Sequence, residues 1–154
     1  MNLQTRLALE PHPEGGYFRR IYTSEAVAQT EHGERQAASS IHYLLTREHP
    51  RGRFHKVRST ILHYLQAGGP VQYACIDAAG GLTETTLGSG EGQGLFLEVP
   101  AGTWKASRLI GDADHALVSE VVIPGFDWAD HHYLDPATLS QPLRERLKAA
   151  CWLD

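Results

Sequence analysis

The chain has 154 residues, a length that suits one domain, and its 42% hydrophobic and 21% charged residues are ordinary for a globular protein. Its formal net charge of −4 provides no broad basic surface, so we do not expect nucleic acid as a partner. The longest uncharged stretches fall short of the roughly 20 apolar residues that span a bilayer, and Met1–Glu10 has no signal-peptide core. We therefore predict a single domain over residues 1–154, no membrane partner and a cytoplasmic location.

The first elements are a short helix and then a series of strands. Asn2 is a helix N-cap, and the helix must end before Pro11. Eight short runs of aromatic, β-branched and aliphatic residues follow, separated by turns rich in Gly and Pro. The runs are Tyr17–Thr23, Ser39–Leu45, Thr60–Leu65, Val71–Ile76, Leu82–Leu87, Leu95–Val99, Lys105–Ile110 and Leu117–Ile123. Glu25–Arg35 is polar and is predicted as a loop. The pattern indicates an all-β fold, with a barrel or sandwich over about residues 16–130.

Near the end of the chain the hydrophobic period becomes helical. Asp135 is predicted as an N-cap, with Pro136 at the first helical position. Apolar side chains then recur every four residues, at Leu139, Leu143, Leu147 and Cys151. We expect a helix over about residues 136–151 that packs outside the barrel or against a second subunit. Because the strands at 60–65 and 95–99 are apolar on both faces, a homodimer is predicted.

One segment carries a family resemblance. Residues His12–Phe18 read His-Pro-Glu-Gly-Gly-Tyr-Phe, which resembles the opening signature of a cupin branch of small bacterial and fungal proteins. The likeness is collinear from about Leu7 to His132 and continues through Ile41–Leu45, Val99–Trp104 and Val122–Trp128. The resemblance implies a double-stranded β-helix, or jelly-roll barrel, that is usually dimeric and similar to the barrel of the dTDP-4-dehydrorhamnose 3,5-epimerases. It implies no particular reaction, because few members of the branch have an assigned activity.

The resemblance also bears on metal binding. Metal-binding cupins hold a divalent cation with two His, one Glu and a later His. The aligned motifs place Arg53 and His55 at the paired His positions, Ile61 at the Glu and Lys105 at the late His. One ligand of four remains, and an ammonium group repels a cation. We therefore predict no metal and no other cofactor.

A rearranged metal site is the alternative to this interpretation. His63 lies two residues after Ile61, on the same strand face, so it can join His55 as a second inward imidazole. The additional ligands of such a site would come from His42 and from Glu98 or Glu120. This alternative keeps a divalent metal, bound by His55 and His63, as an open hypothesis.

Without a metal, the barrel is interpreted as an acid/base pocket. His55 is the candidate base, because an imidazole titrates near neutral pH and can take a proton from a carbon next to a carbonyl. The candidate acids are tyrosines, with Tyr64 as the first choice and Tyr73 and Tyr43 as alternatives. Lys105 or Arg53 would hold the developing enolate, a phosphate or a carboxylate.

Several further side chains are candidate ligand contacts, each with a structural interpretation beside the functional one. Glu14 either contacts ligand or bonds to backbone amides, and Tyr17 either contacts ligand or packs. Trp104 either stacks on a ligand or belongs to the core. The pair at His131 and His132 is interpreted as solvated surface rather than as a metal clip.

Three functions follow from these patterns. The first is a metal-independent isomerase or epimerase that acts on a sugar or keto compound, with His55 as base. The second is a non-catalytic protein that binds a small ligand. The third is a metal-dependent cupin with a rearranged His site.

Overall fold

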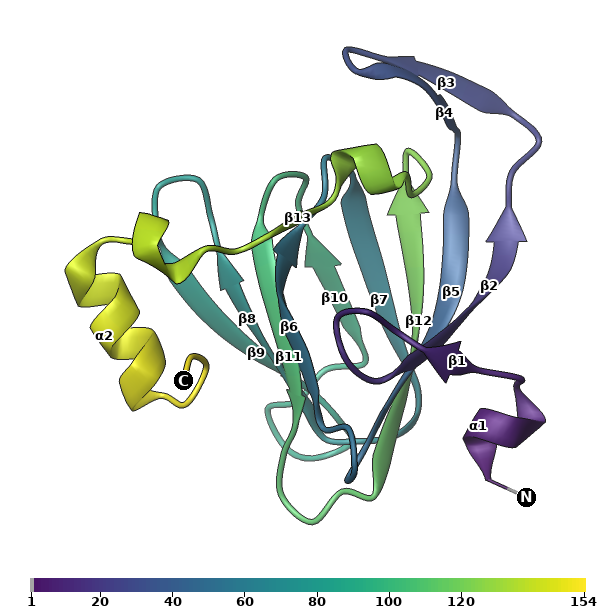
Figure 1. Ribbon diagram of the computed structural model, residues 1–154. Coiled ribbons are helices and arrows are strands. Elements are labelled where there is room, and N and C mark those ends of the chain that lie inside the picture. Colours follow the sequence, from purple (N-terminus) through teal and green to yellow (C-terminus); the bar gives the residue numbers. More distant parts are fainter. Residues whose placement is uncertain (1) are drawn as a thin grey trace.

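Two antiparallel sheets facing each other form the body of the molecule in the computed structural model, which describes residues 2–154 and leaves Met1 outside (Figure 1). The elements are, in chain order, α1 (Leu3–Arg6), β1 (Glu10–Pro11), β2 (Tyr17–Thr23), β3 (Val27–Thr30), β4 (Gly33–Gln36), β5 (Ser39–Thr46), β6 (Arg51–Lys56), β7 (Thr60–Gly68), β8 (Val71–Ile76), β9 (Leu82–Leu87), β10 (Phe96–Val99), β11 (Trp104–Leu109), β12 (His115–Ile123), η1 (Trp128–Asp130), β13 (His132–Tyr133), η2 (Pro136–Thr138) and α2 (Gln141–Ala149). The larger sheet has the order β1-β2-β5-β12-β7-β10 and the smaller one β13-β6-β11-β8-β9. This is a jelly-roll β-sandwich, as predicted.

The apolar core lies between the two sheets at one end of the sandwich. Its buried members come from both sheets, and they are Tyr43, Leu45, Val71, Tyr73, Leu87, Ala116 and Val118. Because side chains alternate along a strand, each strand that contributes to this interior does so with one of its two faces. The same alternation that places Tyr73 inside places its neighbours Gln72 and Ala74 on the opposite face of β8.

The C-terminal helix covers the outer face of the smaller sheet, as the sequence predicted. Leu147 of α2 is fully buried, in a cluster with Phe54 of β6 and Ala106 of β11. The helix boundaries differ from the prediction, because Asp135 caps only the short η2 and Ser140 caps α2. A helix running on from residue 136 would need an N–H at position 142, and Pro142 has none, so the helix restarts with Pro142 in its first turn.

Two further predictions about elements are wrong. The segment Glu25–Arg35, predicted as a loop, forms most of the β3–β4 hairpin, which projects away from the two sheets in Figure 1. Its polar composition resembled a loop because neither face of this two-stranded ribbon is buried in the core. The strand Arg51–Lys56 was not predicted, since the three basic residues in it mask the pattern of a strand.

Among residues 2–154, no helix has the length and apolar character needed to cross a membrane. Both cysteines, Cys75 and Cys151, are free.

Candidate functional site

A small cavity opens between the two sheets at the end near β13 and η1. Apolar side chains make up most of its wall, together with four groups that titrate and one guanidinium. The lining residues are His12, Glu14, Phe18, Arg20, Ile41, His55, Val57, Ile61, Glu120, Val122, Phe126 and Trp128. The cavity volume is about 60 Å³. That is room for a few waters or for a molecule of about four to six non-hydrogen atoms.

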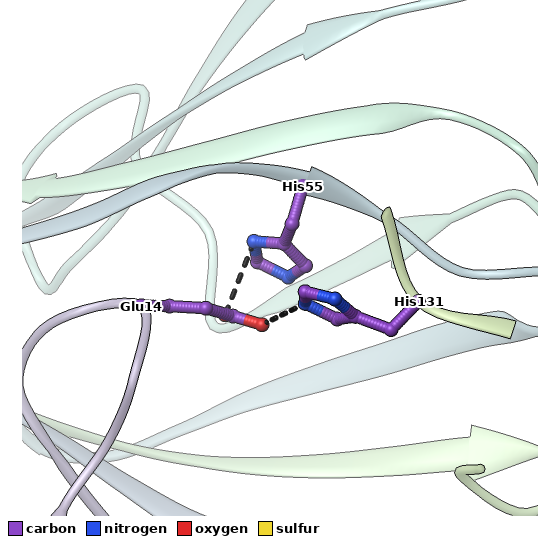
Figure 2. A group of neighbouring side chains, drawn as sticks. All are labelled: Glu14, His55 and His131. Carbon is purple, nitrogen blue, oxygen red and sulfur yellow. Dashed lines mark hydrogen bonds and ion pairs between the residues drawn. The ribbon is translucent and has the colours of Figure 1, made fainter. Parts of the chain in front are cut away.

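A carboxylate shared by two imidazoles forms one wall of the cavity, and Figure 2 shows this Glu14 cluster (Glu14, His55 and His131). His131 Nε2 lies 2.6 Å from Glu14 Oε1, and His55 Nδ1 lies 3.1 Å from Glu14 Oε2. The two imidazole rings are stacked, with their planes 13° apart. All three residues are nearly excluded from solvent, so these interactions are formed without competition from water.

The hydrogen bonds fix where each imidazole carries its proton. His55 Nδ1 faces two acceptors, the Arg53 carbonyl oxygen at 2.9 Å and Glu14, so it is the protonated nitrogen. His131 carries its proton on Nε2, which donates to Glu14. His12 has the opposite tautomer to His55. Its Nδ1 accepts a hydrogen bond from the Glu14 backbone N–H at 3.0 Å, so its Nε2 is the nitrogen that carries the proton. Within residues 2–154, His55 Nε2 has no hydrogen-bond partner and remains a free acceptor at the cavity.

Three distant segments bring the Glu14 cluster together. Glu14 lies in the tight loop between β1 and β2, where Gly15 and Gly16 have φ values of +107° and +72° that only glycine adopts freely. His55 is held by β6, one residue from its end. His131 follows η1, whose Asp130 carboxylate accepts two hydrogen bonds from Arg35 of β4, at 2.8 and 2.9 Å.

A second group of polar side chains lies deeper between the sheets, and we refer to His63, Lys105 and Glu120 as the Lys105 cluster. Lys105 Nζ is 2.8 Å from His63 Nε2 and 3.3 Å from Glu120 Oε1. His63 Nδ1 donates to the Leu97 carbonyl oxygen at 3.1 Å, so its Nε2 lone pair accepts from the ammonium group. His63 is fully buried and Lys105 is only 3% exposed.

The surroundings of His55 and of His63 keep these two imidazoles neutral at pH 7. Burial lowers the pKa of His55 to about 4, with Glu14 opposing the shift and Lys105 adding to it. Burial and then the charge of Lys105 lower the pKa of His63 to about 3. Burial acts to raise the pKa of Glu120, but Lys105 and the nearby imidazoles outweigh it and lower that pKa to about 2. Glu14 is ionised as well, because hydrogen bonding from His131 and nearby charges lower its pKa against the opposing effect of burial.

The structure brings three of the candidate residues, His55, His63 and Lys105, close together. Lys105 and His55 are directly paired across β11 and β6, and Lys105 contacts His63 from β7. Glu14 joins them through its contact with His55 rather than through backbone amides, which corrects one of the two interpretations of Glu14. Lys105 itself does not line the cavity, since Glu120 lies between it and the open space.

Other candidate residues lie away from the cavity, on outward faces of the sheets. Tyr64 is 40% exposed and packs against Phe96. Arg53 is stacked on the Tyr133 ring at 3.9 Å, and Trp104 lies beneath Lys56 at 4.4 Å. His42 is hydrogen-bonded to Ser119, and Tyr17 lies beside His49. Glu98 is exposed. The structure does not bring these six side chains to His55.

Three residues of the site were missed or misinterpreted from the sequence. His131 was expected on the solvated surface, and instead its side chain is 3% exposed against Glu14. Arg20 and His12 line the cavity without having been singled out for chemistry. The signal available for His12 was its place in the seven-residue signature, two positions before Glu14. Nothing local marks His131, which is 117 residues from Glu14 along the chain.

The residues at the usual cupin metal positions do not fit a divalent cation. Ile61 is a buried apolar side chain, and the Lys105 ammonium group already lies between His63 and Glu120, where it supplies a positive charge. The ligand atoms of the Glu14 cluster are within 4.8 Å of one another, which is close enough for a metal. A metal there would have to replace the proton that His131 Nε2 shares with Glu14, so binding it means breaking the 2.6 Å hydrogen bond.

Comparison with known proteins identifies the family. Residues 2–134 match the family described as Cupin_5, Cupin superfamily (DUF985). The chain belongs to this cupin family. The cupin is similar to the uncharacterized protein YML079W of Saccharomyces cerevisiae, with 37% identity over 139 residues that cover 80% of this chain and 69% of the yeast protein.

Solved structures agree with this assignment. Protein SO0799 from Shewanella oneidensis superposes on the cupin with a TM-score of 0.82 and 30% identity, covering 97% of this chain and 94% of that one. A hypothetical protein from Leishmania major gives a TM-score of 0.80 and 31% identity, covering 87% and 86%. Bacillus subtilis oxalate decarboxylase, in its W96F variant, gives a TM-score of 0.59 at 18% identity and covers 94% of this chain but 34% of that one. That last likeness shows the fold alone.

Proposed function

We propose that this cupin is a metal-independent proton-transfer enzyme, an isomerase or epimerase that acts on a small carbonyl compound with His55 as base. The observation that carries the proposal is the pair of acceptors that faces His55 Nδ1, the Arg53 carbonyl oxygen at 2.9 Å and Glu14 at 3.1 Å. We infer from it that the ring proton is on Nδ1, which makes the lone pair of Nε2 the basic site at the cavity.

The surrounding groups support each part of such a reaction. A proton taken from the carbon next to a carbonyl moves to His55 Nε2, and the ionised Glu14 at 3.1 Å from Nδ1 stabilises the imidazolium that forms. His12 lines the same cavity with an N–H to offer, so it is placed to donate to the carbonyl oxygen as negative charge develops there. Burial, with the Lys105 charge adding to it, lowers the pKa of His55, so the imidazole is neutral at pH 7 and free to accept a proton. In an isomerisation the imidazolium of His55 then returns the proton to the neighbouring carbon, whereas an epimerisation needs a donor on the opposite face of the enolate, for which His12 is the candidate at this cavity. The exposed Tyr64 has no part in either reaction.

The test is exchange of carbon-bound hydrogen with solvent. Protein treated with a chelator and then freed of it is incubated in deuterium oxide with pyruvate and with glyceraldehyde, and deuterium uptake is followed by NMR. We expect uptake into at least one compound, a loss of at least about 100-fold in His55→Gln, and no change in His42→Gln, whose imidazole is on the outer face. Undiminished uptake in His55→Gln would refute the proposal.

The same experiment separates the two alternative functions. A protein that binds one of these compounds tightly without any deuterium uptake is a non-catalytic binding protein. Uptake that appears only after a divalent metal is added back, and that is lost in His131→Gln, identifies a metal-dependent cupin with the Glu14 cluster as its site. The cytoplasmic location stays a prediction.

We also propose that the active form is a homodimer joined through the outer face of the larger sheet. Tyr64 and Phe96 are 40% and 49% exposed there, with their ring centroids 5.2 Å apart, and the neighbouring Leu95 is 62% exposed. Exposed apolar side chains gathered on one face are typical of a surface that a second subunit covers. Light scattering after gel filtration should give twice the mass of 17.0 kDa, and Phe96→Glu should give a monomer. A monomeric unmodified protein would contradict this arrangement.

A further inference from the structure

Arg20 is the one guanidinium that lines the cavity, and its charge is not neutralised by the protein. In the paired strands β2 and β5, Arg20 is opposite Ile41, and both side chains line the cavity. Within residues 2–154, no carboxylate lies within ion-pair distance of Arg20, and its side chain donates only to Thr23 Oγ1, at 3.3 Å. Its guanidinium carbon is 5.9 Å from the centre of the Phe126 ring, so it extends across the rim of the cavity.

The two carboxylates of the site differ in how far they are neutralised. Glu120 is paired with the Lys105 ammonium group, whereas Glu14 accepts a hydrogen bond from His131, lies 3.1 Å from the neutral His55 and keeps its charge. An anionic group on a ligand is therefore repelled by Glu14 and attracted to Arg20. Arginine pairs with carboxylates through two parallel hydrogen bonds, which fixes the orientation of the ligand as well as its charge.

The size and the polarity of the cavity restrict the rest of the ligand. Its volume of about 60 Å³ excludes a whole nucleotide sugar from the interior. Between Arg20 and His55 the lining is apolar, from Phe18, Ile41 and Val57 among others. A ligand that fits has a short apolar body, one charged end and one end that reacts.

We propose that Arg20 binds the carboxylate of a small oxo acid whose carbonyl end lies at His55. This inference rests on the proposed function for the identity of the reacting end, and it makes Arg20 the residue that selects anionic over neutral substrates. Its expected signature is a preference for a carboxylate over an uncharged group of the same shape.

Binding of two matched probes tests the inference. Pyruvate and pyruvamide differ in that an uncharged amide of the second replaces the carboxylate of the first. Calorimetry should show pyruvate bound at least about tenfold more tightly than pyruvamide by the unmodified protein. Arg20→Gln should lose at least about tenfold in pyruvate affinity and leave pyruvamide affinity unchanged, whereas Arg20→Lys should retain part of the preference. The matched control is Arg19→Gln, because Arg19 is the neighbouring exposed arginine on the opposite face of β2.

The outcomes for Arg20 and for the proposed function are separable. If pyruvate binding depends on Arg20 but no deuterium enters pyruvate, the role of Arg20 stands and the base role of His55 fails. If deuterium exchange depends on His55 but neither binding nor exchange changes in Arg20→Gln, the role of Arg20 is overturned. Equal affinity of the unmodified protein for both probes, or no binding of pyruvate at all, also overturns it.

Discussion

His55 and His63 are two buried imidazoles that carry their proton on the same nitrogen, Nδ1, and differ in what lies next to Nε2. Each donates its Nδ1 proton to a backbone carbonyl oxygen, of Arg53 and Leu97 respectively. The difference is at Nε2, which in His63 accepts from the Lys105 ammonium group at 2.8 Å and in His55 has no partner among the described residues. Burial and the choice of tautomer therefore do not by themselves make a histidine a base. A histidine is available for proton transfer only where its second nitrogen is left open at a cavity.

The two clusters should therefore respond differently to mutation, and the largest effect is expected in the Lys105 cluster. Lys105→Met leaves the Glu120 carboxylate buried without its cation, which should cost about 3–5 kcal/mol of the free energy of unfolding. The double variant Lys105→Met/Glu120→Gln removes the unpaired charge and should recover much of that loss. Urea denaturation measures both, and a double variant no more stable than the single one would contradict the charge argument.

Acid should weaken the Lys105 cluster through His63. The pKa of His63 is about 3 in the folded protein, against 6.5 for an ordinary histidine, so between these two pH values the unfolded chain binds a proton that the folded protein does not. Stability contributed by neutral His63 is complete above pH 6.5 and is lost as the pH falls toward 3. Between pH 7 and pH 5 this loss is about 2 kcal/mol.

The measurement is denaturation of the unmodified protein and of His63→Gln at the two pH values. We expect the variant to be less stable at pH 7 but to lose about 2 kcal/mol less on acidification. Parallel losses in the two proteins would show that His63 is already an imidazolium in the folded state.

A smaller effect on stability is expected in the Glu14 cluster. Glu14→Gln keeps the shape of the side chain but loses the charge and one acceptor, which should cost about 1–2 kcal/mol. We expect Glu14→Gln to affect deuterium uptake more than it affects stability, since the imidazolium of His55 loses the carboxylate that stabilises it. Glu98→Gln, on the exposed outer face of β10, is the control and should change neither quantity. A variant with unchanged uptake would show that Glu14 has no role in the reaction.

The Lys105 cluster was predictable from the sequence to a larger extent than the Glu14 cluster. Strand alternation put His63 and Tyr64 on opposite faces, and the family motifs aligned His55 with Lys105. Alternation does not say which face is inside, which is why Tyr64 was a candidate acid although it lies on the outer surface.

The Glu14 cluster depends on contacts that no local pattern encodes. Glu14 and His131 come from a turn near one end of the chain and from the segment after η1, and only the closed fold brings them to 2.6 Å. The strand that carries His55 was itself missed, because Arg51, Arg53 and Lys56 give it the composition of a loop. The fold could thus be predicted from periodicity and motifs, but the availability of one nitrogen atom could not.

The most direct test of the account is the tautomer of His55 in solution. Long-range ¹H–¹⁵N NMR at pH 7, assigned by comparison with His55→Gln, distinguishes a protonated from a bare imidazole nitrogen. We expect a neutral ring with the proton on Nδ1 and a bare Nε2, unchanged in His63→Gln. A proton on Nε2, or an imidazolium at pH 7, would contradict the proposed role of His55, because neither form leaves Nε2 free to accept a proton from a ligand.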